Sequence, residues 1–211
     1  MKLNRIFQKL GSYNYSGDLE NDAEGILEIF GKEETFYHVK AVTLKALEIA
    51  EHYNVDQEKV RIAALLHDFS AIIPPKYRLA VARQLGVEEI KENDIDNPIM
   101  LHGKISAQLG KKYFGITDIE TLDAMKYHTT LCSDASLAEQ IVFIADKIAL
   151  DPSGKHNAEY MDDVKNTVND DVTKACWYYL KWMFENLEEL DWQRHYNAVA
   201  AYEWLNSIYR D

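Results

Sequence analysis

Two acidic residues stand at positions of this sequence where the hydrophobic pattern would accept an apolar side chain. Asp68 follows an apolar run in "RIAALLHDFS" and comes directly after His67. Asp146 is the only acidic residue inside the apolar stretch "IVFIADKIAL". Burying a carboxylate costs several kcal/mol unless a partner or a metal ion compensates its charge. A metal ion would explain both aspartates together.

Four histidines lie beside apolar or small residues, where they could complete such a site. They are His38 in "FYHVKAV", His67 in "LLHDFS", His102 in "PIMLHGKIS" and His128 in "MKYHTTL". Neutral imidazoles and ionised carboxylates are ligands for Fe, Mn, Zn or Co, whereas Mg²⁺ and Ca²⁺ prefer oxygen. Adjacent helical side chains point about 100° apart. His67 and Asp68 therefore either straddle one metal ion at a helix end or leave the acid to bridge two.

Each of these residues also has a simpler explanation. A single histidine on an apolar helix is more often a hydrogen-bonded core residue than a ligand. Asp146 beside Lys147 could be a surface ion-pair position. The remaining histidines lie in polar surroundings and are expected at the surface. They are His52, His156 and His195.

Composition and charge restrict the class of protein. The 211 residues are 47% hydrophobic and 27% charged, and the net charge of −12 argues against binding a nucleic-acid polymer. Cys132 and Cys176 show no CxxC spacing, so we expect neither a disulfide framework nor a zinc knuckle. No segment resembles a signal peptide or could span a bilayer, so we expect a cytoplasmic protein. The charged segments "EEIKENDID" and "EYMDDVKNTVNDD" are expected to be solvated.

Helical periodicity predicts an all-α, single-domain fold with about eight helices. No stretch alternates apolar and polar residues as a half-buried strand would. Several helix starts are marked by capping residues or by proline. They are a cap at Asp56, an Asn97-Pro98 opening of a helix that runs to Gly115, and capping boxes of Thr117 with Glu120 and of Ser136 with Glu139.

The order of these residues resembles a known family. His38, then His67-Asp68, then Asp146 resemble the H…HD…D signature of HD-domain metal-dependent phosphohydrolases. The stretches "AALLHDFS", "PIMLHGKISAQLGKKYFGITD", "AMKYHTT" and "IVFIADKI" are similar to its YqeK branch, which hydrolyses diadenosine tetraphosphate symmetrically to two ADP. The resemblance implies an HD-type helical bundle with a metal-binding core over about residues 35–150. Helices over about residues 160–211 would pack on that core.

The resemblance also implies a metal site. His38, His67, Asp68 and Asp146 would hold a tightly bound ion, which is iron in this branch, with Mn or Co as alternatives.

His102 and His128 match two further histidines of the branch, which face the substrate phosphates or a second metal ion. Asp68 is the ligand best placed to bridge, and it joins both histidines as a catalytic candidate. Asn197 in "RHYNAVAAYEW" matches an asparagine that holds the nucleotide.

Three positions depart from the pattern of the branch. Ala71 stands where a Lys usually follows HD, Pro152 where an Arg usually ends the last motif, and Leu131 where a Gly usually follows "HTT". Because Arg and Lys are natural partners of a polyphosphate, we expect an intact metal site but a changed grip on the substrate. A paralogue with another phosphorylated substrate stays open. The candidate replacements for the missing cations are Lys104, Lys147 and Lys155.

The expected reaction is hydrolysis of a nucleotide phosphoanhydride by a metal-activated water, with a small-molecule nucleotide as substrate. The alternatives are an HD-type nucleoside monophosphatase and a non-catalytic nucleotide sensor that retains the metal site. A helical interaction protein is a third alternative, because the C-terminal third carries aromatic residues that could form core, cover the ligand pocket or make a homodimer face. These aromatic residues are Trp177, Tyr178, Tyr179, Trp182 and Trp192.

Overall fold

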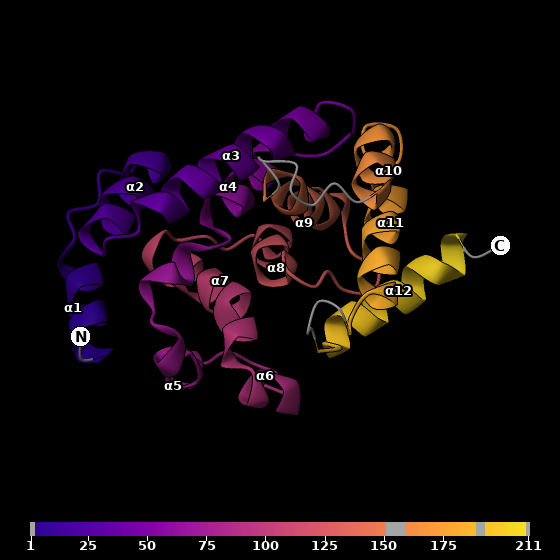
Figure 1. Cartoon of the computed structure of the whole chain (residues 1–211). Coiled ribbons are helices and arrows are strands. Elements are labelled where there is room, and N and C mark those ends of the chain that lie inside the picture. Colours follow the sequence, from indigo (N-terminus) through magenta and orange to yellow (C-terminus); the bar gives the residue numbers. More distant parts are fainter. Residues whose placement is uncertain (1–2, 151–158, 189–192, 210–211) are drawn as a thin grey trace.

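Helices account for all regular structure in the part of the chain that the computed structural model describes, residues 3–150, 159–188 and 193–209 (Figure 1). No β-strand occurs within these residues, so the predicted all-α fold is confirmed. Three short 3-10 helices, Phe69–Ile72, Pro75–Tyr77 and Pro98–Leu101, lie between α4 and α7. The α-helices are α1 (Leu3–Ser12), α2 (Leu19–Ile29), α3 (Glu33–Ala50), α4 (Gln57–Leu66), α5 (Arg78–Gln84), α6 (Glu92–Asp96), α7 (His102–Tyr113), α8 (Ile119–Tyr127), α9 (Leu137–Ala149), α10 (Glu159–Thr167), α11 (Val172–Glu185) and α12 (Tyr196–Tyr209).

The expected number of about eight helices is too low, since the described residues form twelve α-helices. Short helices such as α5 and α6 span too few residues to show a full apolar period. The single helix expected from Asn97 to Gly115 is instead a 3-10 turn that begins at Pro98, followed by α7. The Asn97 side chain makes no capping hydrogen bond there.

Side-chain caps set the starts of several helices. Asp56 caps α4, and Ser136 with Glu139 forms the expected capping box of α9, so both predictions are confirmed. At α8 the expected box of Thr117 with Glu120 is wrong. Asp118 caps this helix instead, because its carboxylate accepts the Thr121 N–H at 2.9 Å.

The central helix of the fold is α9. All residues from Ala138 to Lys147 are buried, and the helix packs against α3, α4, α8 and α11. This position explains why α9 is apolar on nearly every side instead of on one face. Asp146 consequently enters the interior from the most enclosed helix.

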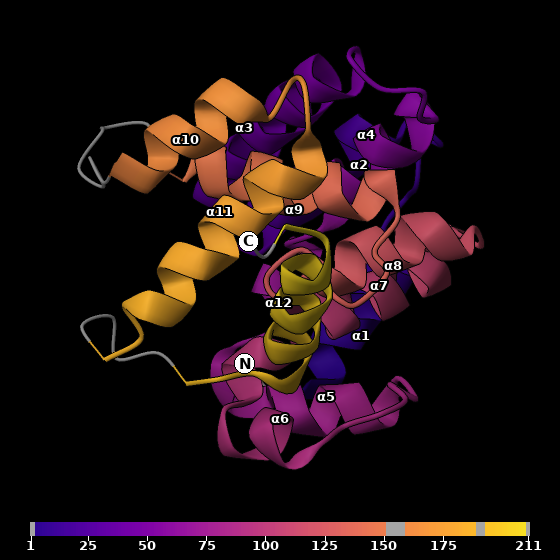
Figure 2. The same cartoon turned by 90° about the vertical axis from the view of Figure 1, so that its right-hand side faces the viewer.

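The C-terminal helices form a layer at the end of the molecule opposite α1 and α2 (Figure 1). α10 packs on α11, α11 packs on α9, and α12 crosses α11 (Figure 2). Tyr179 is buried, and Trp177, Tyr178 and Trp182 pack partly buried against the core. Most of the aromatic segment therefore belongs to the core. Trp192 lies outside the described residues.

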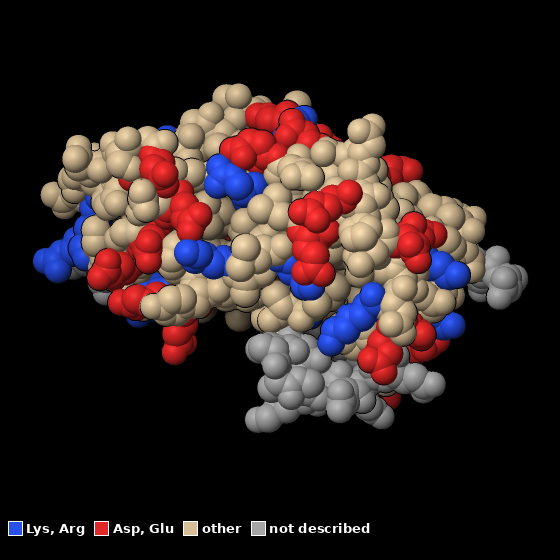
Figure 3. All heavy atoms as spheres, turned by 90° about the horizontal axis from the view of Figure 1, so that it is seen from above, with Lys and Arg blue, Asp and Glu red and all other residues tan. Residues whose placement is uncertain are grey.

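Charged side chains of both signs lie on the surface. Acidic side chains lie beside basic ones on the face shown in Figure 3. Cys132 and Cys176 are both free thiols, as the spacing predicts. Within the described residues, no helix combines the length and the apolar character that crossing a bilayer requires.

Candidate metal centre

Side chains from α3, α4, α7, α8 and α9 meet at one place in the fold. The structure brings together Asp68, Asp146 and the four histidines that stand beside apolar residues. They are His38 on α3, His67 and Asp68 at the end of α4, His102 at the start of α7, His128 at the end of α8, and Asp146 on α9.

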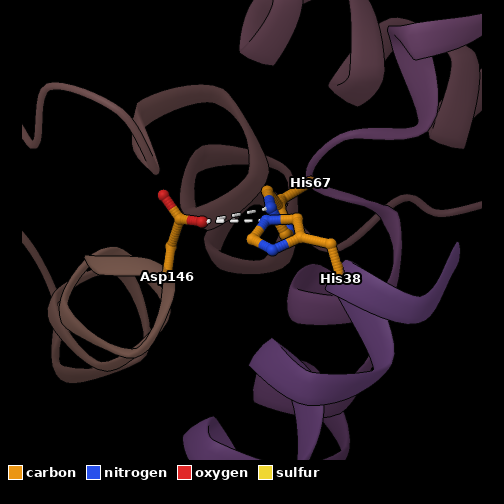
Figure 4. Close-up of side chains that lie close together, drawn as sticks. All are labelled: His38, His67 and Asp146. Carbon is orange, nitrogen blue, oxygen red and sulfur yellow. Dashed lines mark ion pairs between the residues drawn. The ribbon is translucent and has the colours of Figure 1, made fainter. Parts of the chain in front are cut away.

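His38, His67 and Asp146 form the first group of candidate ligands. Both histidines point at one carboxylate oxygen, with His38 Nε2 at 3.1 Å and His67 Nε2 at 3.6 Å from Asp146 Oδ1 (Figure 4). The three ligand atoms lie within 4.8 Å of one another. Groups at this separation can converge on one metal ion.

Asp68 lies between two pairs of histidines. Its Oδ2 is 4.0 Å from His38 Nε2 and 3.7 Å from His67 Nε2. Its Oδ1 is 3.7 Å from the Nε2 atoms of both His102 and His128. The two oxygens thus face different pairs, which is the geometry of a carboxylate that bridges two cationic centres.

Backbone carbonyls fix the protonated nitrogen of three of these histidines. The Nδ1 atom of each lies within hydrogen-bonding distance of the carbonyl oxygen three residues earlier. A carbonyl oxygen only accepts, so Nδ1 carries the hydrogen, and Nε2 of the neutral ring keeps its lone pair. The pairs are His67 with Ala64 (2.7 Å), His102 with Ile99 (2.7 Å) and His128 with Met125 (2.8 Å).

These lone pairs fit a metal cation. His67 Nε2 is buried without a hydrogen-bond partner among the described residues, which costs about 1–3 kcal/mol for a buried polar atom. His102 Nε2 and His128 Nε2 lie 3.0 Å apart, where two lone pairs would repel each other. Imidazole nitrogens with carboxylate oxygens suit Fe, Mn, Co or Zn. The donor set therefore fits a divalent transition metal.

The hydroxyl of Thr129 joins the second histidine pair. Its Oγ1 lies 2.9 Å from His102 Nε2 and 3.0 Å from His128 Nε2. One hydroxyl hydrogen can serve only one of these nitrogens at a time. Sequence reasoning missed Thr129, although the stretch "HTT" contains it.

The protonation states of Asp68, His102 and His128 also favour metal binding. Burial would raise the pKa of Asp68, but the nearby His67, His128 and His102 outweigh burial and lower it to about 2. Burial holds the pKa of His102 below its ordinary value and that of His128 well below it. Near neutral pH the carboxylate is therefore ionised and these two imidazoles are neutral.

Lys147 neutralises the second oxygen of Asp146. Its Nζ lies 2.7 Å from Asp146 Oδ2 and donates to the His128 carbonyl oxygen at 3.2 Å. Burial would raise the pKa of Asp146, but Lys147 and the two neighbouring histidines hold it well below the ordinary range. The surface ion pair that the simpler explanation expected is wrong in its location, because both side chains are buried.

Of the other two candidate replacements for the missing cations, Lys104 has its partners elsewhere in the fold. Lys104 is buried and held by Asp94 Oδ2 at 2.9 Å and by the Tyr196 hydroxyl at 2.6 Å. Lys155 and Pro152 lie outside the described residues.

A glycine lets the two histidine-bearing helix ends approach. A Cβ on Gly103 would lie 2.6 Å from the backbone oxygen of Lys126 and 3.0 Å from that of Met125. Only glycine permits this contact, which sets His102 beside His128. Ser70 secures the same helix start by donating its hydroxyl to the His102 carbonyl oxygen at 2.9 Å.

The backbone at Leu131 has a conformation that favours glycine. The residue has φ +58°, in the left-handed region, and its N–H donates to the Tyr127 carbonyl oxygen at 2.7 Å to close the end of α8. Its side chain is nevertheless fully buried in the core. The turn after His128 therefore forms with leucine at this position.

A cavity of about 1020 Å³ opens beside the candidate ligands. His38, Asp68, His102, His128 and Asp146 line one part of it.

Residues of α11 and of the segment before α12 line another part of this cavity, among them Tyr179, Phe184 and Arg194. The chain from α6 to the 3-10 helix before α7 also contributes to its lining. The residues that line it do not include Asn197, which lies in the first turn of α12, directly before the lining residue Ala198.

The expected solvent exposure is wrong for His195 and for Asp94. His195 is buried rather than on the surface, and its Nε2 lies 3.3 Å from Asp94 Oδ1. Asp94, in the segment "EEIKENDID", is fully buried and pairs with Lys104. His195 and Asp94 are 101 positions apart, so the polarity of their neighbours in sequence gave no signal of this contact. His52 is exposed as expected, and His156 lies outside the described residues.

Comparisons with known proteins identify the family of this chain. The model of the HD domain family matches residues 35–151, more than half of the chain. The chain is 30% identical over 157 residues to an uncharacterized protein in the pepC 5′ region of Lactococcus lactis subsp. cremoris, covering 74% of each chain. It is 26% identical to a symmetrical bis(5′-nucleosyl)-tetraphosphatase of Bacillus subtilis, covering 83% of this chain and 91% of that protein.

A solved structure shows the same fold. The crystal structure of a predicted HD superfamily hydrolase involved in NAD metabolism from Clostridium acetobutylicum superposes with a TM-score of 0.80. The two chains are 30% identical, and the match covers 93% of this chain and all of the other. Because the HD domain model matches more than half of the chain, this chain belongs to the HD domain family of hydrolases.

Proposed function

We propose that this chain hydrolyses diadenosine tetraphosphate symmetrically to two ADP, as a metal-dependent phosphohydrolase. The observation that carries the proposal is the position of Asp68, whose two oxygens face two separate pairs of histidines at the wall of a large cavity. The name of the Bacillus subtilis relative supports the choice of substrate.

His38, His67, Asp68 and Asp146 would hold the metal ion, with iron as the first candidate and manganese or cobalt as alternatives. A bound divalent ion would supply a water of lowered pKa and would offset the charge of a phosphoryl group. Lys147 balances the second oxygen of Asp146, so the aspartate stays ionised and oriented.

His102 and His128 face the opposite oxygen of Asp68 and are proposed to receive the phosphate groups or to hold a second metal ion. Thr129 can donate its hydroxyl hydrogen to whichever Nε2 is not otherwise engaged, which keeps the pair oriented. Asn197, in the first turn of α12, is proposed to contact the nucleotide.

The size of the cavity supports a dinucleotide substrate. A volume of about 1020 Å³ lies at the upper end of the range for small-molecule sites. Tyr179 and Phe184 provide aromatic surface for a base beyond the candidate ligands. A cytoplasmic location and a homodimer stay predictions.

Product analysis tests this proposal. The protein is loaded anaerobically with Fe²⁺, or separately with Mn²⁺ or Co²⁺, and incubated with diadenosine tetraphosphate before the nucleotides are separated. ADP alone supports symmetric hydrolysis, whereas AMP with ATP would show cleavage at a different bond. In a separate incubation, release of phosphate from AMP by protein that leaves diadenosine tetraphosphate intact would favour a nucleoside monophosphatase. Absence of turnover in protein with verified metal content would favour a nucleotide sensor.

Two variants control the assignment of the metal site. Asp68→Ala should lose both the bound metal and the activity, since Asp68 lies between both histidine pairs. His52→Ala should retain both, because His52 is exposed and outside the cluster. Full metal content in Asp68→Ala would show that the site is misassigned.

A further inference from the structure

The cavity has few positive side chains for an anionic substrate. Among the described residues that line it, the cationic side chains other than histidine are Lys147 and Arg194. Lys147 is already bonded to Asp146 and to the His128 carbonyl oxygen. Arg78 donates to the Ile99 carbonyl oxygen at 3.0 Å and is not among the lining residues. Of the two lysine and arginine side chains among the described lining residues, Arg194 is therefore the one with capacity to meet a ligand.

The guanidinium of Arg194 is exposed in the cavity. It lies 5.8 Å from the centre of the Phe184 ring, a position typical of a cation resting on an aromatic face. Arg194 forms no ion pair with a carboxylate in the described part of the chain. No described residue therefore engages its five N–H donors, which can meet a ligand.

The backbone next to Arg194 is firmly anchored. His195 Nδ1 accepts the N–H of Asn197 at 3.3 Å, so Nε2 carries the hydrogen and donates it to Asp94 Oδ1 at 3.3 Å. Asp94 is fully buried and also pairs with Lys104 on α7. This network fixes the chain immediately before α12 against α6 and α7, and Figure 2 shows the start of α12 directed toward α6. The backbone directly after Arg194 is consequently held in place, so a ligand that binds Arg194 need not order it.

We propose that Arg194 binds phosphate oxygens of the nucleotide and determines affinity for polyphosphate substrates. This inference rests on the proposed function and names a residue for it. A guanidinium matches two phosphate oxygens at once, so it is well suited to a polyphosphate chain. The need for such a cation is acute because the protein carries a net charge of −12 and Glu185 and Glu188 also line the cavity.

Equilibrium binding measured by calorimetry tests the proposal. ADP and adenosine are titrated into Mn²⁺-loaded wild type, Arg194→Gln, Arg194→Lys and Arg83→Gln. The matched control, Arg83, is an exposed arginine on α5 and undergoes the same change in charge. Thermal unfolding of each variant establishes that it is folded. We expect Arg194→Gln to weaken ADP binding about tenfold and to leave adenosine binding unchanged. Arg194→Lys should bind ADP more tightly than Arg194→Gln but less tightly than wild type.

Three results would overturn the proposal. ADP binding in Arg194→Gln could equal that of wild type, adenosine and ADP could weaken equally, or Arg83→Gln could lose as much affinity as Arg194→Gln. The comparison is separate from the test of the proposed function. If wild type binds ADP but hydrolyses no nucleotide, the proposed reaction fails while the ratio of ADP to adenosine binding still decides the role of Arg194.

Discussion

The Nε2 atoms of His102 and His128 lie 3.0 Å apart, although the two residues belong to different helices and are 26 positions apart in the sequence. Each ring donates its Nδ1 hydrogen to a backbone carbonyl, so the facing nitrogens both present lone pairs. Such a contact is unfavourable unless a proton lies between the nitrogens or a hydroxyl or a cation contacts them. The Thr129 hydroxyl lies within hydrogen-bonding distance of both nitrogens and can donate to one of them, and a ligand or an ion can compete for the same position.

Gly103→Ala should disturb this histidine pair. The new methyl group would lie 2.6 Å from the Lys126 backbone oxygen, and backbone can move away only if α7 shifts from the end of α8. Overpacking of this kind costs about 1–3 kcal/mol. We expect a lower free energy of unfolding in urea and a lower kcat with verified metal content.

Gly110→Ala, on the same helix, is the matched control for this prediction. Its methyl group would meet the flexible end of the Met125 side chain at 3.0 Å, which can rotate away. Replacing a helical glycine by alanine gains up to about 1 kcal/mol. Equal losses of stability in both variants would contradict the argument from close helix approach.

Much of the site could be predicted because its residues violate the local hydrophobic pattern. Asp68 and Asp146 stand out as acids in apolar helices, and the structure brings them to a common group of histidines. The helices themselves follow from periodicity and capping residues such as Asp56 and Ser136. The division into a core over about residues 35–150 and a C-terminal layer stays a prediction.

Other features could not be predicted because they depend on contacts between distant segments. Asp94 and His195 are 101 positions apart, and each appears solvated when only its neighbours in sequence are considered. Gly103 matters because of the backbone of α8, which no pattern within α7 reveals. Thr129 shows no signal of its own until His102 and His128 are placed beside it.

Metal binding should stabilise the protein, and chelation should reverse the effect. A bound ion would meet the buried Nε2 of His67 and compensate Asp68 and Asp146, contacts that unfolding would lose. At a free metal concentration of one hundred times Kd the gain is about 2.7 kcal/mol. Thermal unfolding with and without Mn²⁺ measures it. The shift should disappear in Asp68→Ala, and a shift equal to that of wild type would contradict the assignment.

Asp94 and Lys104 should show strong energetic coupling. Asp94→Asn leaves the Lys104 ammonium buried without its carboxylate, and Lys104→Met leaves the carboxylate without its ammonium. Each change should cost about 3–5 kcal/mol. The double variant removes both charges and should cost clearly less than the sum of the single variants. Urea unfolding of the four proteins gives the coupling, and simple additivity would show that the pair contributes nothing as a pair.

Acid should destabilise the protein partly through Asp94. Burial would raise the pKa of this carboxyl, but hydrogen bonds from His195 and Lys104 outweigh it and hold the pKa well below the ordinary 3.8. A depressed pKa contributes stability that is complete above pH 3.8 and is lost as the pH falls below it. In Asp94→Asn the free energy of unfolding should therefore fall less steeply between about pH 4 and pH 2, by up to about 1.4 kcal/mol per pH unit. Unfolding curves of equal slope for wild type and variant would contradict this.

Leu131→Gly would have two opposing effects on the free energy of unfolding. Glycine would relieve the left-handed backbone at φ +58°, which costs a non-glycine residue about 1–2 kcal/mol. It would also remove a fully buried side chain, and truncating a buried leucine costs about 2–5 kcal/mol. The loss of packing is the larger quantity, so we expect a net destabilisation of about 1–3 kcal/mol in urea unfolding. Leu131→Ala keeps the backbone cost and also loses packing, so it should be less stable than Leu131→Gly. The opposite order would show that the turn after His128 is not strained by its side chain.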